Sequence, residues 1–95
     1  MTKQQEVIDI LKQNRKQMKS FGVKRLGLFG SFARGDAGAS SDLDFVVEFE
    51  RKTFDAYMGL KIFLEELFHR PVDLVMKDSI KPRLRDVILK ETIYA

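Results

Sequence analysis

The sequence predicts one small α/β domain in which helices and strands alternate along the chain. Residues 23–29 and 42–50 alternate between apolar and polar side chains, which is typical of half-buried strands. Residues 53–68 instead carry apolar side chains at helical spacing. We therefore expect the order α-β-α-β-α-β-α in a single layered domain that spans all 95 residues.

The composition is that of a soluble globular protein, with 44% hydrophobic and 33% charged residues. No stretch is long and apolar enough to span a membrane, and the first residues, MTKQQEV, lack the apolar core of a signal peptide. There is no cysteine, which excludes disulfides and thiolate metal sites. These features favour a cytoplasmic protein that does not contact a membrane.

The formal net charge of +3 is compatible with binding to nucleic acid, to nucleoside triphosphates or to an acidic protein. The basic residues are scattered among acidic ones rather than grouped in a block. This pattern favours a solvated surface of mixed charge over direct nucleic-acid binding.

The first helix is expected from Thr2 to about Lys19, with Thr2 and Gln5 resembling a capping box. Its apolar positions are Val7, Ile10, Leu11 and Met18. A strand should follow over 23–29. We expect Ser31 to cap a short helix that ends at Arg34, before a loop over 35–41.

The strand over 42–50 has the strictest alternation in the chain. Its apolar face is formed by Leu43, Phe45, Val47 and Phe49, and its other face by Asp42, Asp44, Val46 and Glu48.

The second half of the chain should contribute a helix, a strand and a final helix. The helix over 53–68 is capped by Thr53, and its aromatic residues are interpreted as core: Phe54, Tyr57 and Phe63. The strand covers 71–76, and the last helix begins near Pro82 with an inner side of Ile80, Leu84, Val87 and Ile88. Residues 92–95 form either a frayed end or a brief extended segment.

Three carboxylates indicate a metal site. Asp42 and Asp44 are two residues apart in a strand and so share one face. Asp73 lies opposite the apolar face of its own strand, so the three converge if the two strands are neighbours. Like charges this close repel and raise one another's pKa values unless a cation intervenes. Mg²⁺ prefers oxygen ligands, and two such ions can clamp the attacking and leaving oxygens of a displacement.

The Gly30-Ser31 pair, which follows the first strand, is the candidate phosphate site. Glycine allows close approach of the backbone, serine adds a hydroxyl, and a helix start offers free N–H groups. Arg34, one turn later, could reach a phosphate oxygen or brace the loop. The run is not a Walker A loop, because no GK[ST] follows, and DLDFV lacks the glycine of an EF-hand.

The run GSFARGDAGASSDLDFVVEF resembles the nucleotidyltransferase superfamily of DNA polymerase β. The signature of this superfamily begins with an apolar strand that ends in Gly-Ser. After roughly ten residues it continues with D-h-D, where h is apolar, and a later strand carries a third acidic residue. In this chain the three parts are matched by Gly30-Ser31, Asp42-Leu43-Asp44 and Asp73. The run is closer still to the minimal nucleotidyltransferases of prokaryotes, whose GSxARGxAxxxSDxDhhV pattern is matched from Gly30 to Val47.

The resemblance implies catalytic and metal-binding roles for Asp42, Asp44 and Asp73, with Mg²⁺ as cofactor and two ions when nucleotide is bound. It also implies that Gly30 and Ser31 hold the outer phosphates of ATP. The reaction implied is transfer of AMP with release of pyrophosphate. The usual acceptor in this subfamily is a tyrosine of a HEPN-domain toxin, which the transferase accompanies as antitoxin in a hetero-oligomer.

The implied site agrees with a polymerase β-like fold, in which helices cover one face of a small mixed sheet and the other face is open to substrate. Antiparallel pairing of the first two strands brings Gly-Ser to the aspartates, and parallel pairing of the next two places Asp73 beside Asp44. Two alternatives stay open: a binding module that neutralises its partner without catalysis, and the catalytic subunit of a small-molecule nucleotidyltransferase.

Overall fold

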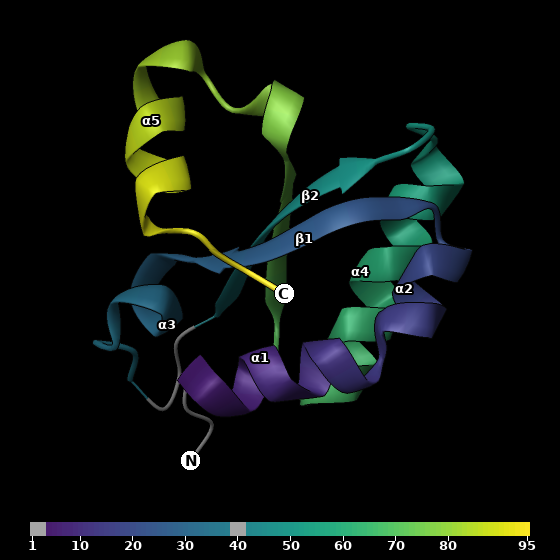
Figure 1. Cartoon of the computed structure of the whole chain (residues 1–95), viewed down its shortest axis with the longest axis horizontal. Helices are drawn as coiled ribbons and strands as arrows, with labels where there is room; N and C mark the ends of the chain where they lie inside the picture. The colour runs from purple at the N-terminus through teal and green to yellow at the C-terminus, as the bar shows by residue number, and fades with distance from the viewer. Residues whose placement is uncertain (1–3, 39–41) are drawn as a thin grey trace.

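Four strands form one mixed sheet in the order β3-β2-β1-β4 (Figure 1). This computed structural model describes residues 4–38 and 42–95. The central pair is antiparallel and joins β1 (Val23–Phe29) to β2 (Leu43–Phe49), whereas β3 (Val72–Met76) runs parallel to β2. Both expected pairings are therefore confirmed. The fourth strand, β4 (Ile93–Tyr94), pairs antiparallel with β1, so the segment after the last helix is extended rather than frayed.

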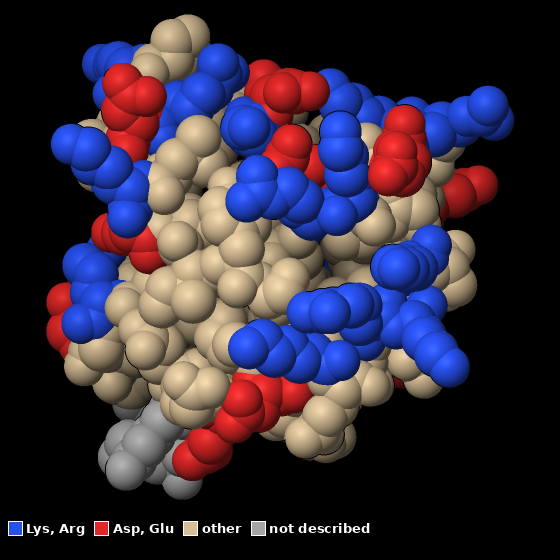
Figure 2. All heavy atoms as spheres, in the orientation of Figure 1, with Lys and Arg blue, Asp and Glu red and all other residues tan. Residues whose placement is uncertain are grey.

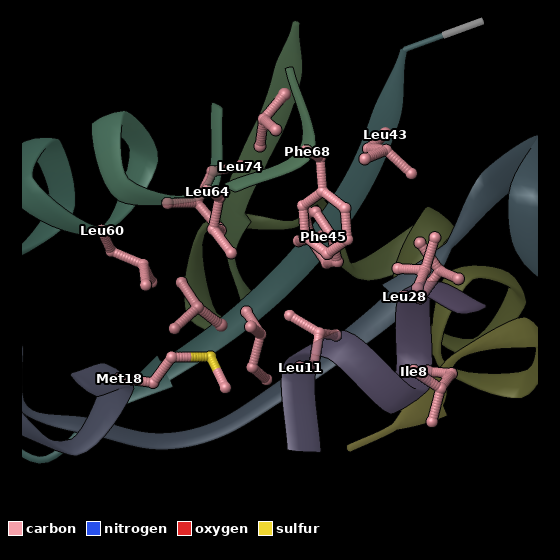
Figure 3. Close-up of a cluster of buried hydrophobic side chains, with 14 of the residues drawn as sticks. Ile8, Leu11, Met18, Leu28, Leu43, Phe45, Leu60, Leu64, Phe68 and Leu74 are labelled. Atoms are coloured by element: carbon pink, nitrogen blue, oxygen red, sulfur yellow. The ribbon is translucent and has the colours of Figure 1, made fainter. Parts of the chain in front are cut away.

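The sheet packs one apolar face against helices. The four residues of the apolar face of β2 are each at most 8% exposed, as the alternation predicts. Phe45 lies at the centre of this core, with its ring centroid 5.9 Å from that of Phe68 (Figure 3). Leu11 and Leu60 come from helices on this side of the sheet and are fully buried. The face that carries Asp44 is therefore the one left for a ligand.

The long helix α4 (Phe54–Phe68) has the predicted bounds and cap. The Thr53 hydroxyl accepts a hydrogen bond of 3.0 Å from the Ala56 N–H. The Tyr57 hydroxyl donates to the carbonyl of Leu74 at 2.6 Å, which ties α4 to β3. Phe54 is 76% exposed, so its assignment to the core was wrong, because it stands at the first position of the helix before the apolar stripe meets the sheet.

The first helix is broken in two, contrary to the expectation of one continuous helix. α1 (Gln4–Gln13) and α2 (Arg15–Ser20) are separated at Asn14, whose side-chain amide donates to the Ile10 carbonyl at 2.8 Å. Asparagine competes in this way with the backbone bonds of a helix. The expected cap at Thr2 lies outside the described residues. Within residues 4–38 and 42–95, no helix combines the length and the apolar character needed to cross a membrane.

The short helix α3 (Gly30–Arg34) begins one residue earlier than expected. Phe29 holds the N-cap position and Ser31 lies inside the helix, so the prediction of a Ser31 cap was wrong. The reason is the backbone of Gly30, whose φ of 75° turns the chain out of β1 without a capping side chain. Gly35 ends the helix in the left-handed conformation at φ 84°.

The last helix, α5 (Pro82–Glu91), begins at Pro82 as predicted but does not pack as predicted. None of its residues is buried; Leu84 is 46% and Val87 63% exposed, so their assignment to an inner side was wrong. A short 3₁₀ turn, η1 (Lys77–Ser79), carries the chain away from β3, and α5 lies away from α1, α2 and α4 but next to α3 (Figure 1). Leu84 lines a shallow groove of about 440 Å³ together with Phe29 and Val75. Figure 2 shows a largely uncharged area beside α5.

Two phenylalanines allow a matched test of the core. Replacing Phe45 with alanine should lower the free energy of unfolding by about 3–5 kcal/mol, because a fully buried ring leaves a cavity. Replacing the exposed Phe54 with alanine should cost less than about 0.5 kcal/mol. Urea denaturation followed by circular dichroism measures both values. Equal losses in the two variants would contradict the assigned core.

Candidate active site

The sheet register brings the two halves of the predicted site together. In the ladder, Asp44 is the direct partner of Phe29 on β1 and of Asp73 on β3. Gly30 and Ser31 follow Phe29 immediately, so they begin α3 at the same end of the sheet. Asp42 lies one residue before β2 and is exposed. The strand pairing therefore places residues from three separate segments around Asp44.

Gly30 and Asp44 are in close contact. A Cβ atom added to Gly30 would lie 2.2 Å from Oδ2 of Asp44, closer than any real contact. Only a glycine can therefore occupy this position while the carboxylate stays where it is. The Gly-Ser turn and the second aspartate are therefore in direct contact.

The charges around Asp44 are unbalanced. Partial burial raises the pKa of the Asp44 carboxyl above its ordinary value, and the carboxylates of Asp73 and Asp42 raise it further. Arg34 acts in the opposite direction, and Glu91 adds to the rise. The position thus has more negative charge than the neighbouring cation offsets.

Arg34 lies on α3 between two carboxylates. Its Nε is 3.3 Å from Oδ2 of Asp36, and its Nη1 is 3.2 Å from Oε2 of Glu91. The hydrogen bond to Asp36, followed by the one to Glu91, raises the pKa of Arg34. The guanidinium thus stays charged and is held at the rim of the site, half exposed.

A family model described as a nucleotidyltransferase domain matches residues 5–95, which is nearly the whole chain. The chain belongs to the nucleotidyltransferase family. This confirms the resemblance that the Gly-Ser and Asp-x-Asp motifs indicated.

Two relatives are similar over most of their length. The protein adenylyltransferase MntA of Thermococcus cleftensis is 38% identical over 92 residues, which cover 95% of this chain and 93% of that protein. A solved structure described provisionally as a minimal nucleotidyltransferase is 38% identical with a TM-score of 0.74, and the match covers 90% of this chain and 93% of that one.

A more distant structure shares the fold. It is a complex of a tri-AMPylated Shewanella oneidensis HEPN toxin with an MNT antitoxin, 19% identical with a TM-score of 0.58. The match covers 87% of this chain and 69% of that one. At this level of identity the likeness is one of fold alone.

The carboxylates of this nucleotidyltransferase fit a hard divalent cation in chemistry. In the described part of the chain, no three acidic or imidazole side chains stand close enough together to hold a metal ion, so the expected cluster of Asp42, Asp44 and Asp73 is not found as a ready-made set of three ligands. A pair of carboxylates is nevertheless the usual protein contribution to a Mg²⁺ site, because substrate phosphates supply further ligands. Asp44 and its cross-strand partner Asp73 provide such a pair. Burial and the neighbouring carboxylates raise the pKa of Asp44, so a bound cation would stabilise its charged form.

The phosphate-binding expectation for Gly30 and Ser31 rests on their place beside Asp44. Ser31 is half-buried, and its carbonyl accepts the N–H groups of Gly35 and Asp36 at 2.9 and 3.0 Å. Ser31 is thus held in the first turn of α3, immediately after the glycine that contacts Asp44.

Glu91 is the site residue that the sequence did not predict. Its Oε1 accepts a hydrogen bond of 3.0 Å from the backbone N–H of Gly30, which is 61 residues away in the chain. The one signal in the sequence is its place in the last turn of a helix, where the helix dipole disfavours negative charge.

A comparison of Gly30 with Gly35 distinguishes the effect of the close contact at Gly30 from the effect of ordinary backbone strain. Gly30→Ala and Gly35→Ala both place a side chain at positive φ, which costs about 1–2 kcal/mol. Gly35 has nothing within 4 Å of an added Cβ, whereas Gly30 has the Asp44 carboxylate. Gly30→Ala should therefore lower the free energy of unfolding by about 1–3 kcal/mol more than Gly35→Ala does, which is the loss typical of an overpacked core position. Urea denaturation measures the difference, and equal losses would show that the contact is not real.

The raised pKa of Asp44 predicts a pH dependence of stability. The folded protein keeps a proton on Asp44 at pH values where the unfolded chain has lost it, so the free energy of unfolding falls as pH rises from about 4 through the raised pKa. Asp44→Asn removes the titrating group and therefore this fall in the free energy of unfolding. Without divalent cations the variant should be more stable than the wild type near about pH 7 and equal to it near about pH 3.

Urea titrations in EDTA across this range measure the effect, with Asp86→Asn as a control that removes an exposed carboxylate elsewhere. A stability gap between Asp44→Asn and the wild type that does not change with pH would contradict the assignment.

Proposed function

We propose that this nucleotidyltransferase transfers AMP from ATP to a tyrosine hydroxyl of a HEPN-domain toxin and thereby acts as its antitoxin in the cytoplasm. The observation that carries the proposal is the position of Asp44, between the Gly30-Ser31 turn and Asp73. The names of the relatives support the chemistry, because one is called a protein adenylyltransferase and another is an antitoxin bound to an AMPylated HEPN toxin.

Each site residue then has a role in the transfer. Gly30 and Ser31 bind the outer phosphates through the backbone N–H and the hydroxyl, and Arg34 contributes its charge at the rim. Asp42 and Asp44 would hold Mg²⁺, and Asp73 would complete the metal site. When bound, Mg²⁺ neutralises phosphate charge and lowers the barrier to displacement at phosphorus.

The acceptor hydroxyl must reach the α-phosphate from the side opposite the leaving pyrophosphate. Asp73 lies on the edge strand β3 and is exposed. Its accessibility supports a role in which its carboxylate orients the incoming hydroxyl and assists loss of its proton. In this proposal the partner protein supplies the rest of the acceptor site.

Transfer from α-labelled ATP tests the proposal. Label should appear on the HEPN partner, and Asp42→Asn plus Asp44→Asn should reduce its rate by about 100-fold or more, because metal stabilisation supplies several kcal/mol and each 1.36 kcal/mol is tenfold. The control is Asp9→Asn plus Asp86→Asn, which removes the same charge from exposed positions of α1 and α5. Equal label with the wild type and the site variant would refute the proposal.

A second candidate function is neutralisation by binding alone. It is favoured by the exposure of Leu84 and Val87 on α5, because exposed apolar side chains of this size can form part of a protein interface. The same site variant separates the two functions. If it still binds the partner and still protects cells, masking is sufficient; if it binds but protection is lost, transfer is required.

A further inference from the structure

The carboxylate of Glu91 lies on the groups that would hold phosphate. Its Oε1 accepts from the Gly30 N–H at 3.0 Å, and its two oxygens lie 3.2 and 3.5 Å from Nη1 of Arg34. The carboxylate comes from the last residue of α5, whereas both donors belong to α3. A single side chain from the end of the chain thus binds two donors of the Gly-Ser turn.

These donors bind anions in general rather than carboxylates in particular. Backbone N–H groups and guanidinium groups form charge-assisted hydrogen bonds with phosphate oxygens as well as with carboxylates. The proposed function assigns Gly30 and Arg34 to the outer phosphates of ATP. A triphosphate and Glu91 would therefore need the same donors.

The surroundings of Glu91 also favour the loss of its hydrogen bonds to Gly30 and Arg34 when a triphosphate binds. It is one of the carboxylates that raise the pKa of Asp44, so the site already has an excess of negative charge. It stands at the C-terminal end of a helix, where the dipole disfavours an anion. α5 has no buried residue, but β4 begins two residues after Glu91 and pairs with β1, so a triphosphate would displace the side chain of Glu91 rather than the end of the helix.

We propose that Glu91 occupies the phosphate-binding donors of Gly30 and Arg34 in the free protein and is displaced by the polyphosphate of the nucleotide. Glu91 is in this sense an internal competitor. It occupies the Gly30 N–H and the Arg34 guanidinium before the substrate arrives, and it thereby lowers the affinity of the site for polyphosphate. The inference rests on the proposed function for the identity of the ligand.

Binding of inorganic tripolyphosphate with Mg²⁺ to the full chain tests the inference by calorimetry. Glu91→Gln weakens the competitor and should bind the probe about three- to tenfold more tightly than the wild type, since a larger fraction of the protein has free donors. Asp86→Asn removes the same charge from an exposed position of the same helix and should change the affinity by less than about twofold. Equal or weaker binding by Glu91→Gln than by Asp86→Asn would overturn the inference.

A shorter carboxylate separates contact from charge. Glu91→Asp keeps the charge but is one methylene too short to reach both donors, so it should also bind tripolyphosphate more tightly than the wild type. Affinity equal to that of the wild type would show that only the charge matters and would overturn the displacement. Urea denaturation of each variant confirms that it is folded.

The amide signal of Gly30 gives a readout that does not depend on affinity. In ¹H–¹⁵N spectra, Glu91→Gln should shift this signal in the free protein, and tripolyphosphate should shift it in the wild type. A Gly30 signal that responds to neither change would refute the contact. Because no transfer is needed for these measurements, the inference can fail while AMP transfer is observed, and it can hold when transfer is not.

Discussion

The pairing of β2 with strands of opposite direction on its two sides is the constraint on which the site depends. Antiparallel pairing brings the end of β1 to the start of β2, and parallel pairing brings the start of β3 to the same place. Phe29, Asp44 and Asp73 therefore stand in one row across three strands. A shift of one residue in either ladder would turn Asp44 or Asp73 toward the apolar core.

The same arrangement carries an electrostatic cost. Asp44 is partly buried next to other carboxylates, and its raised pKa shows that the folded protein disfavours its charge. The core on the opposite face, centred on Phe45, supports a sheet that keeps these groups together. The main core and the carboxylates thus lie on opposite faces of β2, although Val46 on the Asp44 face is also buried.

Much of the fold could be predicted because short-range patterns determine it. The strict alternation in β2 and the capped stripe of α4 gave correct elements, and the expected antiparallel pairing of the first two strands placed Gly30 near Asp44. The rest depends on contacts between distant residues. The exposure of Leu84 follows from the path of η1 rather than from its own pattern. The break at Asn14 is local, but it comes from a side-chain hydrogen bond to the Ile10 carbonyl that the helical periodicity does not reveal. Glu91 meets Gly30 across 61 residues, a contact that no local pattern encodes.

The C-terminal strand places one of the protein's two natural fluorophores close to the site. The sequence has two tyrosines and no tryptophan. Tyr57 reports on the packing of α4 against β3, whereas Tyr94 pairs with Gly27 and lies under Arg25, whose Cζ is 3.8 Å from the ring centroid. Tyr94 is three residues beyond Glu91. The ultraviolet emission of the unlabelled protein therefore divides between the core and the C-terminal segment that follows Glu91.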